Sequence, residues 1–268
     1  MYMLLLIVIG LIVLFTAFMI KPKKRVQKKL VSLGIILVIA GGSGVYQSYQ
    51  GNLSTGDNPK RVEKTTTADS DLANLNYQGT QEVEVNNNTP TFTKSELTVS
   101  NGPWQKFADL DNLNRAIQAD ALLSKSLMPT AKREALYVNP TGWHNKRIKG
   151  GWLYNRSHLI GYQLTGQNNN PKNLMTGTRS LNSPEMLKHE NDIAYYLKQN
   201  PNNFIRYRVK PIYRGNELVA RGVQMMAESL SSNGQPDHQV SFNVYIFNVE
   251  TGVKINYSDG TSLVNNNY

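Results

Sequence analysis

Uncharged apolar residues dominate the first part of the chain. Residues 1–20 carry no charge and are almost wholly aliphatic, and at ~1.5 Å per residue a helix of this length just crosses a ~30 Å hydrocarbon core. Residues 30–49 form a second uncharged run, interrupted by glycines. The loop 21–29 between them is basic, and the positive-inside rule assigns it to the cytoplasm. The pattern predicts a membrane anchor over 1–49 with two transmembrane helices and everything after residue 50 outside the cell.

Two other interpretations of this region are open. The run 30–49 is only weakly hydrophobic and could form a re-entrant or peripheral helix, in which case a single span would leave the rest of the chain inside. A cleavable signal peptide carries its positive residues before the apolar run, whereas here they follow it. The pattern therefore favours an anchor over a cleaved signal.

Polar residues then dominate up to about residue 100. The stretch 50–100 is rich in Ser, Thr, Asn, Gly and Asp with scattered single apolar residues, a composition that buries too little surface to offset the entropy of ordering. We expect a flexible extracellular tether over 50–100, followed by a folded domain over 101–268.

Helical and strand-like patterns alternate within the predicted domain. Apolar residues from Leu110 to Ala121 recur at helical spacing and predict a helix over 110–124. A second helix is expected after Ser183, which suits an N-cap and is followed by Pro184 and Glu185. Alternating runs over 204–213, 218–226, 240–249 and 254–257 predict strands. The predicted fold class is α+β with an antiparallel sheet.

One carboxylate interrupts the apolar face of the second helix. Met186, Glu190, Ile193 and Leu197 fall on one side of it. A buried carboxylate is costly unless it is paired, hydrogen-bonded or near a cation. Spacing alone favours a Glu190 that reaches water from the edge of the stripe.

Composition and charge narrow the function. The chain has no cysteine, which excludes disulfides, cysteine-ligated metals and thiol nucleophiles. The net charge of +10 divides into +6 over residues 1–45, 4 − 7 = −3 over 46–100 and 19 − 12 = +7 over 101–268. The excess on the predicted domain permits nucleic-acid binding without requiring it. A basic strand face at 206–210 could follow a phosphate backbone, although such a face is more often simply solvated.

The candidate chemistry lies between residues 152 and 182. A histidine, His158, stands at the end of a strand-like segment beside Arg156, and a loop crowded with carboxamides follows. A general base, a phosphate-binding cation and hard oxygen ligands for Mg²⁺ are what phosphodiester hydrolysis requires. No nucleotide-binding loop, nucleophile elbow or zinc-protease helix is present in the sequence.

The order of several motifs resembles a known family. Residues 110–115 (LDNLNR), 128–130 (MPT), 140–143 (PTGW), 155–162 (NRSHLIGY) and 173–182 are similar to motifs of the DNA/RNA non-specific endonucleases, the His-Me finger or ββα-metal nucleases. Within them the chain resembles the membrane-anchored DNA-entry nucleases and streptococcal-type DNases of Gram-positive bacteria. The similarity covers about residues 104–258. It implies a ββα-metal core, DNA or RNA as substrate, and DNA-uptake machinery as a partner to consider.

The resemblance also implies roles for individual residues. His158 would be the general base, and Asn182 would be the direct protein ligand of a catalytic Mg²⁺, for which Mn²⁺ could substitute. Glu190 would hold the ion through water, which favours a functional interpretation of its place on the apolar face. The remaining implied residues are Asn173 as support for the site, and Arg156 and Arg179 as contacts to the phosphate. The products would carry 5′-phosphate and 3′-hydroxyl ends.

Two residues depart from the Asp-Arg-Gly-His signature of the family. Asn155 stands in place of the Asp, and Ser157 in place of the Gly. Asn155 can replace an Asp that acts through hydrogen bonds but not one that acts through charge. Ser157 requires a backbone conformation that does not depend on glycine.

Alternatives remain at the level of function and of single residues. A non-catalytic surface protein that captures DNA would share the charge pattern but has no use for the set His158, Asn182 and Glu190, since it needs no general base. A toxin-type nuclease with an immunity partner would be marked by a delivery domain, and none is visible in these residues. The other histidines, His144, His189 and His238, are expected to be structural or exposed. The three tryptophans, Trp104, Trp143 and Trp152, are expected to pack in the core.

Overall fold

The computed structural model describes residues 69–264. The predicted anchor over 1–49, its basic loop 21–29 and the first part of the predicted tether lie outside these residues. Within the described range, no helix has both the length and the hydrophobicity needed to cross a bilayer.

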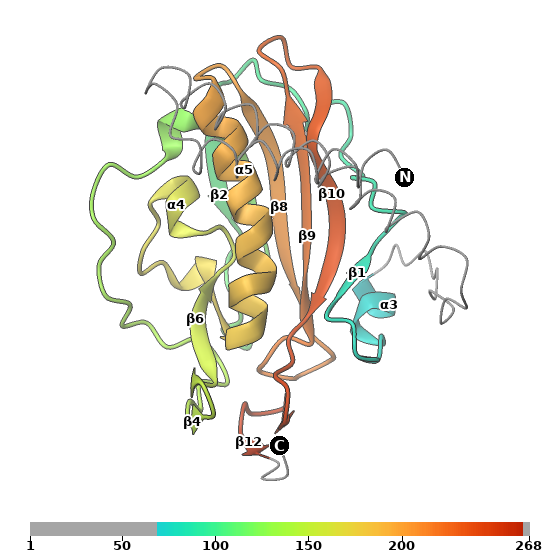
Figure 1. Ribbon diagram of the computed structural model, residues 1–268, viewed down its shortest axis with the longest axis vertical. Coiled ribbons are helices and arrows are strands. Elements are labelled where there is room, and N and C mark those ends of the chain that lie inside the picture. Colours follow the sequence, from blue (N-terminus) through green and yellow to red (C-terminus); the bar gives the residue numbers. More distant parts are fainter. Residues whose placement is uncertain (1–68, 265–268) are drawn as a thin grey trace, which may run out of the picture. The chain divides into compact units, whose positions relative to one another are not determined.

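A six-stranded antiparallel sheet forms the centre of the fold (Figure 1). In spatial order its strands are β1 (Glu82–Glu84), β10 (Pro236–Phe247), β9 (Gly222–Leu230), β8 (Phe204–Ile212), β3 (Ala119–Ser124) and β2 (Trp104–Phe107). Each neighbouring pair is antiparallel. The predicted antiparallel sheet is therefore confirmed, with β9 and β10 displaced by a few residues from the ranges that the sequence predicts.

One face of the sheet carries the main core. Helix α5 (Leu187–Gln199) lies across this face (Figure 1). Its buried residues Ile193 and Leu197 share one apolar cluster with Tyr207 and other β8 residues that alternate along the strand. The expected N-cap, Ser183, has an extended backbone, with φ −154° and ψ 120°, but α5 begins only at Leu187, with Met186 in the cap position and no side-chain cap hydrogen bond.

Shorter elements sit beside α5 on the same side. The hairpin strands β6 (Tyr154–His158) and β7 (Leu174–Thr178) pair antiparallel. The other short elements are η2 (Lys125–Leu127), the β4 (Arg147–Ile148) and β5 (Gly151–Trp152) hairpin, α4 (Tyr162–Thr165), η3 (Pro171–Asn173), η4 (Leu181–Met186), and the pair β11 (Val253–Ile255) and β12 (Ser262–Val264). The chain order β6, β7, α5 forms a ββα unit.

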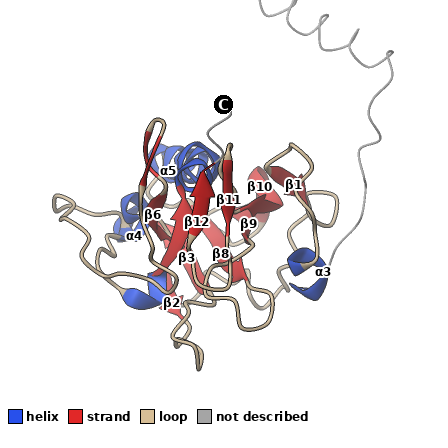
Figure 2. Ribbon diagram, turned by 90° about the horizontal axis from the view of Figure 1, so that it is seen from below, coloured by secondary structure: helices blue, strands red, loops and turns tan. Residues whose placement is uncertain are grey.

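The opposite face of the sheet is covered by segments on either side of β1, within residues 69–100. Helix α3 (Asp69–Ala73) lies on the far side of the sheet from α5 (Figure 2). Leu72 and Val85 are each 1% exposed and pack with Tyr245 and Phe247 of β10. The prediction of a tether over 50–100 is thus wrong for residues 69–100, because a few apolar anchors suffice when a preformed sheet face receives them.

The basic strand face is also covered. Arg206 and Arg208 both bind the carboxylate of Asp120, and Arg208 Nη2 lies 2.5 Å from Glu96 Oε1. The Arg206 guanidinium also stacks 4.7 Å from the ring centre of Phe92. Arg206 and Arg208 are neutralised within the fold, so their part of the strand face does not follow a phosphate backbone and is not simply solvated.

The predicted helix over 110–124 does not form. Residues 108–118 are irregular, and the Asp111 carboxylate accepts hydrogen bonds from the backbone N–H groups of Leu113 and Arg115. Residues 119–124 form the inner strand β3, which is buried on both faces. A strand buried on both sides has no polar alternation, which is why its residues fitted a helical spacing.

The tryptophans lie at the surface of the fold and not in its core. Trp152 is 48% exposed, and Trp104 and Trp143 are half-buried. An arginine stacks on each of the three: Arg206 on Trp104, Arg156 on Trp143 and Arg147 on Trp152. The expectation of core packing is therefore wrong for all three.

Candidate active site

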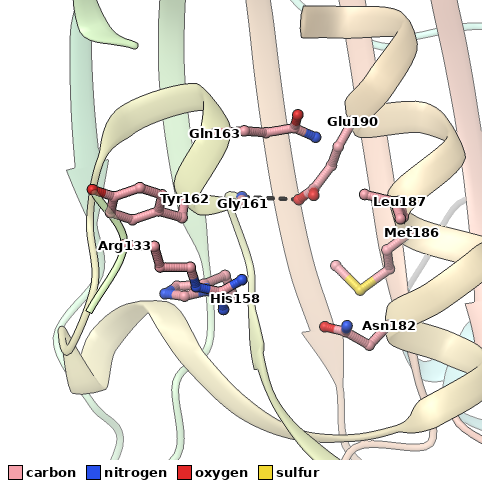
Figure 3. Close-up of a pocket in the computed structure, with 9 residues that line it drawn as sticks. All are labelled: Arg133, His158, Gly161, Tyr162, Gln163, Asn182, Met186, Leu187 and Glu190. Atoms are coloured by element: carbon pink, nitrogen blue, oxygen red, sulfur yellow. Dashed lines mark hydrogen bonds between the residues drawn. The ribbon is translucent and has the colours of Figure 1, made fainter. Parts of the chain in front are cut away.

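A cavity of about 380 Å³ opens between the β6–β7 connection and the start of α5 (Figure 3). His158 and Arg133 lie on one wall, and Asn182, Met186 and Glu190 lie on the other. The remaining lining residues are Gly161, Tyr162, Gln163 and Leu187. Three of the residues implied by the resemblance, His158, Asn182 and Glu190, thus meet in one cavity.

His158 ends β6, and its ring is held in one orientation. Its Nε2 atom lies 2.8 Å from the backbone carbonyl oxygen of Asn168. A carbonyl oxygen only accepts, so Nε2 carries the hydrogen and Nδ1 is left as the acceptor of the neutral ring. Burial, together with the charge of Arg133, lowers the pKa of His158 below its ordinary value. The ring is therefore a neutral base near pH 7.

The segment after His158 is fixed by Asn173, which is fully buried. Its side-chain Oδ1 accepts from the Ile160 N–H at 2.9 Å, and its Nδ2 donates to the Ile160 carbonyl at 3.0 Å. Its own carbonyl accepts from the Leu159 N–H. Asn173 does not line the cavity; it supports the backbone that does.

Glu190 enters the cavity from α5 and is 8% exposed. Its Oε1 accepts a hydrogen bond of 2.8 Å from the Gly161 N–H. Burial raises the pKa of Glu190 to about 7, against the opposing effects of this bond and of the Arg133 charge. Glu190 is thus held beside backbone and does not reach out to water at the edge of the helix.

Gly161 makes this approach of Glu190 possible. A Cβ atom at residue 161 would lie 2.3 Å from Glu190 Oε2, which is far inside van der Waals contact. No side chain other than hydrogen fits between the β6–β7 connection and the carboxylate.

We expect Gly161→Ala to displace the Glu190 carboxylate and break its bond to the residue 161 amide. Losing a positioning contact of this kind lowers metal affinity or activity by about 10–100-fold. The measurement is plasmid cleavage at rising Mg²⁺ concentration. A double-mutant cycle with Glu190→Gln tests the route: if the two losses simply add, the glycine does not act through the carboxylate.

Other predicted residues lie outside the cavity. Arg156 donates to Asn139 Oδ1 at 2.6 Å and stacks on Trp143. Arg179 binds the carbonyl of Gly150 at the β4–β5 turn. Asn155 is half-buried on β6 opposite Gly177. The structure does not bring these three side chains together with His158.

The departure at Ser157 is accommodated by the neighbouring strand. Ser157 has no positive φ, since it is a regular β6 residue. A Cβ atom at Gly177 on β7 would lie 2.2 Å from Ser157 Oγ. The serine side chain therefore fills space that a glycine on β7 leaves open.

Two residues near the site were missed from the sequence. Arg133 comes from an irregular loop and has no local signal apart from the MPT motif that ends three residues earlier. Tyr207 of β8 carries a buried hydroxyl for which residues 69–264 provide no hydrogen-bond partner. Burial and the charge of Glu190 raise the pKa of this tyrosine.

The fold and the sequence together identify the class of protein as a nuclease. A hairpin and a helix that bring a histidine, an amide and a carboxylate into one cavity match the ββα unit that the motifs imply. The family model for DNA/RNA non-specific endonucleases matches residues 93–231. The chain belongs to this family of nucleic-acid-cleaving enzymes.

Individual relatives agree with this assignment. A deoxyribonuclease of Streptococcus dysgalactiae subsp. equisimilis is 33% identical over 112 residues, which are 40% of this chain and 32% of that protein. The chain thus matches about a third of that relative's length. Magnesium-bound NucA of Streptococcus agalactiae superposes with a TM-score of 0.60 and 25% identity, over 73% of this chain and 94% of NucA. Zinc-bound Sda1 nuclease superposes with a TM-score of 0.52 and 26% identity, over 60% of this chain and 80% of Sda1. Related nucleases therefore bind divalent metals.

Proposed function

We propose that the protein is a divalent-metal-dependent endonuclease that hydrolyses phosphodiester bonds in DNA, with RNA as a second substrate to test. The observation that carries the proposal is an oriented histidine across one cavity from a carboxamide and a buried carboxylate. Family membership supports the class of reaction.

The donors in the cavity fit a magnesium ion. Asn182 and Glu190 offer hard oxygen atoms, and Mg²⁺ is usually bound through one or two protein oxygens while it keeps several waters. The described residues contain no cluster of three or more His, Cys, Asp or Glu suited to a metal, so a fully protein-coordinated ion is not indicated there. Asn182 would bind directly and Glu190 through water. When bound, the cation supplies positive charge against the charge that develops on the phosphate.

The protein's own residues supply the proton transfer. His158 Nδ1 takes a proton from the attacking water as its oxygen bonds to phosphorus. The bond from phosphorus to the 3′-oxygen breaks, and that oxygen takes a proton from solvent, leaving 5′-phosphate and 3′-hydroxyl ends. Arg133, on the same wall as His158, is suited to contact the phosphate.

A non-catalytic DNA-capture protein is the alternative. Such a protein has no use for an oriented neutral histidine or for a buried carboxylate with a raised pKa. The substitution of Ser157 for the glycine of the signature does not favour this alternative, because Gly177 makes room for the serine.

We propose a membrane-anchored nuclease with its domain outside the cell. The support is the sequence of residues 1–49, with two uncharged runs and a basic loop between them. Extracellular DNA would then be the substrate, and DNA-uptake machinery a partner to seek.

The test uses the full chain on supercoiled plasmid with Mg²⁺, with Mn²⁺ or with EDTA. We expect nicking and linearisation with either metal and none with EDTA. Asn182→Ala should raise the Mg²⁺ concentration needed for cleavage by about 10-fold or more. Cleavage that persists in EDTA would contradict the metal dependence. A folded protein that binds plasmid without cutting it would leave the capture function as the better account.

A further inference from the structure

The arginines near the β4–β5 hairpin differ from those on the central sheet in having no acidic partner within residues 69–264. Arg206 and Arg208 are neutralised by Asp120 and Glu96. Arg147 and Arg156 form no ion pair with any carboxylate in residues 69–264, and each stacks on a tryptophan instead, at 4.3 Å and 4.6 Å from the ring centres.

The sequence around these arginines is free of acids. Residues 135–184 include six lysines and arginines and no aspartate or glutamate. This fifty-residue stretch contains the β4–β5 hairpin, the β6–β7 hairpin and His158. The carboxylate of Asp259 acts on Tyr154 nearby, and it accepts hydrogen bonds from Thr261 in its own loop. Of the six cations, Lys172 alone pairs with a carboxylate within residues 69–264, that of Asp109. The field at this surface therefore favours a polyanion.

The aromatic and basic side chains lie in sequence along β6, between the β4–β5 hairpin and the cavity. The β4–β5 hairpin lies at one end of β6 in Figure 1, and His158 is the residue at the other end. Side chains alternate along a strand, so Tyr154, Arg156 and His158 share a face. The Tyr154 ring contacts Trp143, and Arg156 covers Trp143. The strand spans about 13 Å, or about four nucleotides at ~3.4 Å per nucleotide.

The turn of the β4–β5 hairpin is fixed to the main fold. Arg179 Nη1 binds the Gly150 carbonyl, and a Cβ atom at Gly151 would overlap this guanidinium. Arg179 thus holds the hairpin that carries the exposed Trp152. A large aromatic residue kept at 48% exposure on a fixed arm is suited to contact a ligand.

From these observations we infer that the β4–β5 arm is a substrate-binding surface that holds the nucleic-acid strand several nucleotides from the bond to be cut. Arg147 contacts a phosphate beyond the one that the resemblance implies for Arg156, and Trp152 stacks on an unpaired base. The inference rests on the proposed nuclease function and extends it from the cavity to the hairpin.

The test measures binding without cleavage. In a His158→Ala background, the full chain is titrated against labelled single-stranded DNA of roughly 30 nucleotides and against a duplex of the same length, followed by fluorescence anisotropy. Arg147→Gln with Trp152→Ala should weaken single-strand binding about 10-fold or more at about 0.1 M salt, and duplex binding less. The slope of log Kd against log salt should fall by about 0.7 for the lost phosphate contact.

Lys198→Gln with Tyr195→Ala is the matched control, because it removes one cation and one exposed aromatic from the outer side of α5. A loss at the arm no greater than that of the control would overturn the inference, as would a parent protein that binds no nucleic acid. A parent that binds through the arm but whose wild-type form cuts nothing would contradict the proposed function alone. Unchanged melting temperatures verify that each variant is folded.

Discussion

Replacing His158 with alanine is expected to lower the rate of DNA cleavage by about 10²–10⁴-fold, the range for loss of a general base. The reason is geometric: the Asn168 carbonyl fixes the hydrogen on Nε2 of the ring that lines the cavity, which leaves Nδ1 as the proton acceptor in the proposed reaction. Plasmid cleavage in Mg²⁺, measured beside DNA binding, checks this. Binding should be retained, since the arm and Arg133 are untouched.

His189→Ala is the matched control for this change. His189 lies on α5, where its Nε2 faces Glu82 at 2.6 Å and its ring packs on Phe242, away from the cavity. The His189→Ala variant should cut DNA at the parental rate.

The rate of DNA cleavage by the wild type should depend on pH. Since burial lowers the pKa of His158, this rate should rise with pH below the ordinary histidine value of 6.5 and level off near neutrality. If His158→Ala cuts DNA as fast as the parent protein, His158 is not the general base.

The second large effect concerns stability. Asp120→Asn is expected to lower the free energy of unfolding by about 3–5 kcal/mol, because it leaves the buried Arg206 short of its counter-charge. Asp120 is 9% exposed and binds both Arg206 and Arg208. Urea unfolding at neutral pH, followed by circular dichroism, provides the measurement.

The pH dependence of this cluster has a definite sign. Burial opposes the ionisation of Asp120, but hydrogen bonds from Arg206 and Gln118 and the charges of both arginines hold its pKa below the ordinary 3.8. An acid with a depressed pKa stabilises the fold above its unfolded pKa and loses that effect as pH falls through the folded value. The gap between wild type and Asp120→Asn should therefore close in acid.

The exposed pair on the same sheet face provides a comparison. Lys210 binds Asp69, whose side chain is 51% exposed, and surface pairs contribute about 0–1 kcal/mol. Asp69→Asn should change stability by no more than that. Equal effects of the two substitutions would show that burial of the Arg206 cluster contributes nothing.

The part of the site that could be predicted is the part encoded locally. His158, Asn182 and Glu190 stand in short segments whose order and spacing carry the signal. The carboxylate on an apolar helix face was itself a physical clue. The hydrogen-bond partner of this carboxylate has no signal in the sequence. The amide of Gly161 meets Glu190 only because Asn173 fixes the preceding backbone.

Contacts between distant segments explain what was missed. Arg133 reaches the cavity from an irregular loop, whose path depends on the tertiary fold and not on any periodicity. The residues of strand β3 fit a helical spacing because a strand buried on both faces shows no alternation of polar and apolar residues. The composition of residues 69–100 predicts a tether because Leu72 and Val85 are isolated in the sequence, and only the tertiary fold brings them against the sheet face.

The close fit of Ser157 to Gly177 makes these two positions epistatic. They lie on neighbouring strands and share the volume of a single side chain. A bulkier residue at 177 becomes acceptable only after the serine is shortened, and glycine at both positions leaves a void beneath the histidine strand. Grafting the β6 segment that carries His158 between members of the family therefore requires the paired residue of β7 to be exchanged as well. A chimera that exchanges β6 alone could lose activity because β6 and β7 no longer pack, and not because its catalytic residues are wrong.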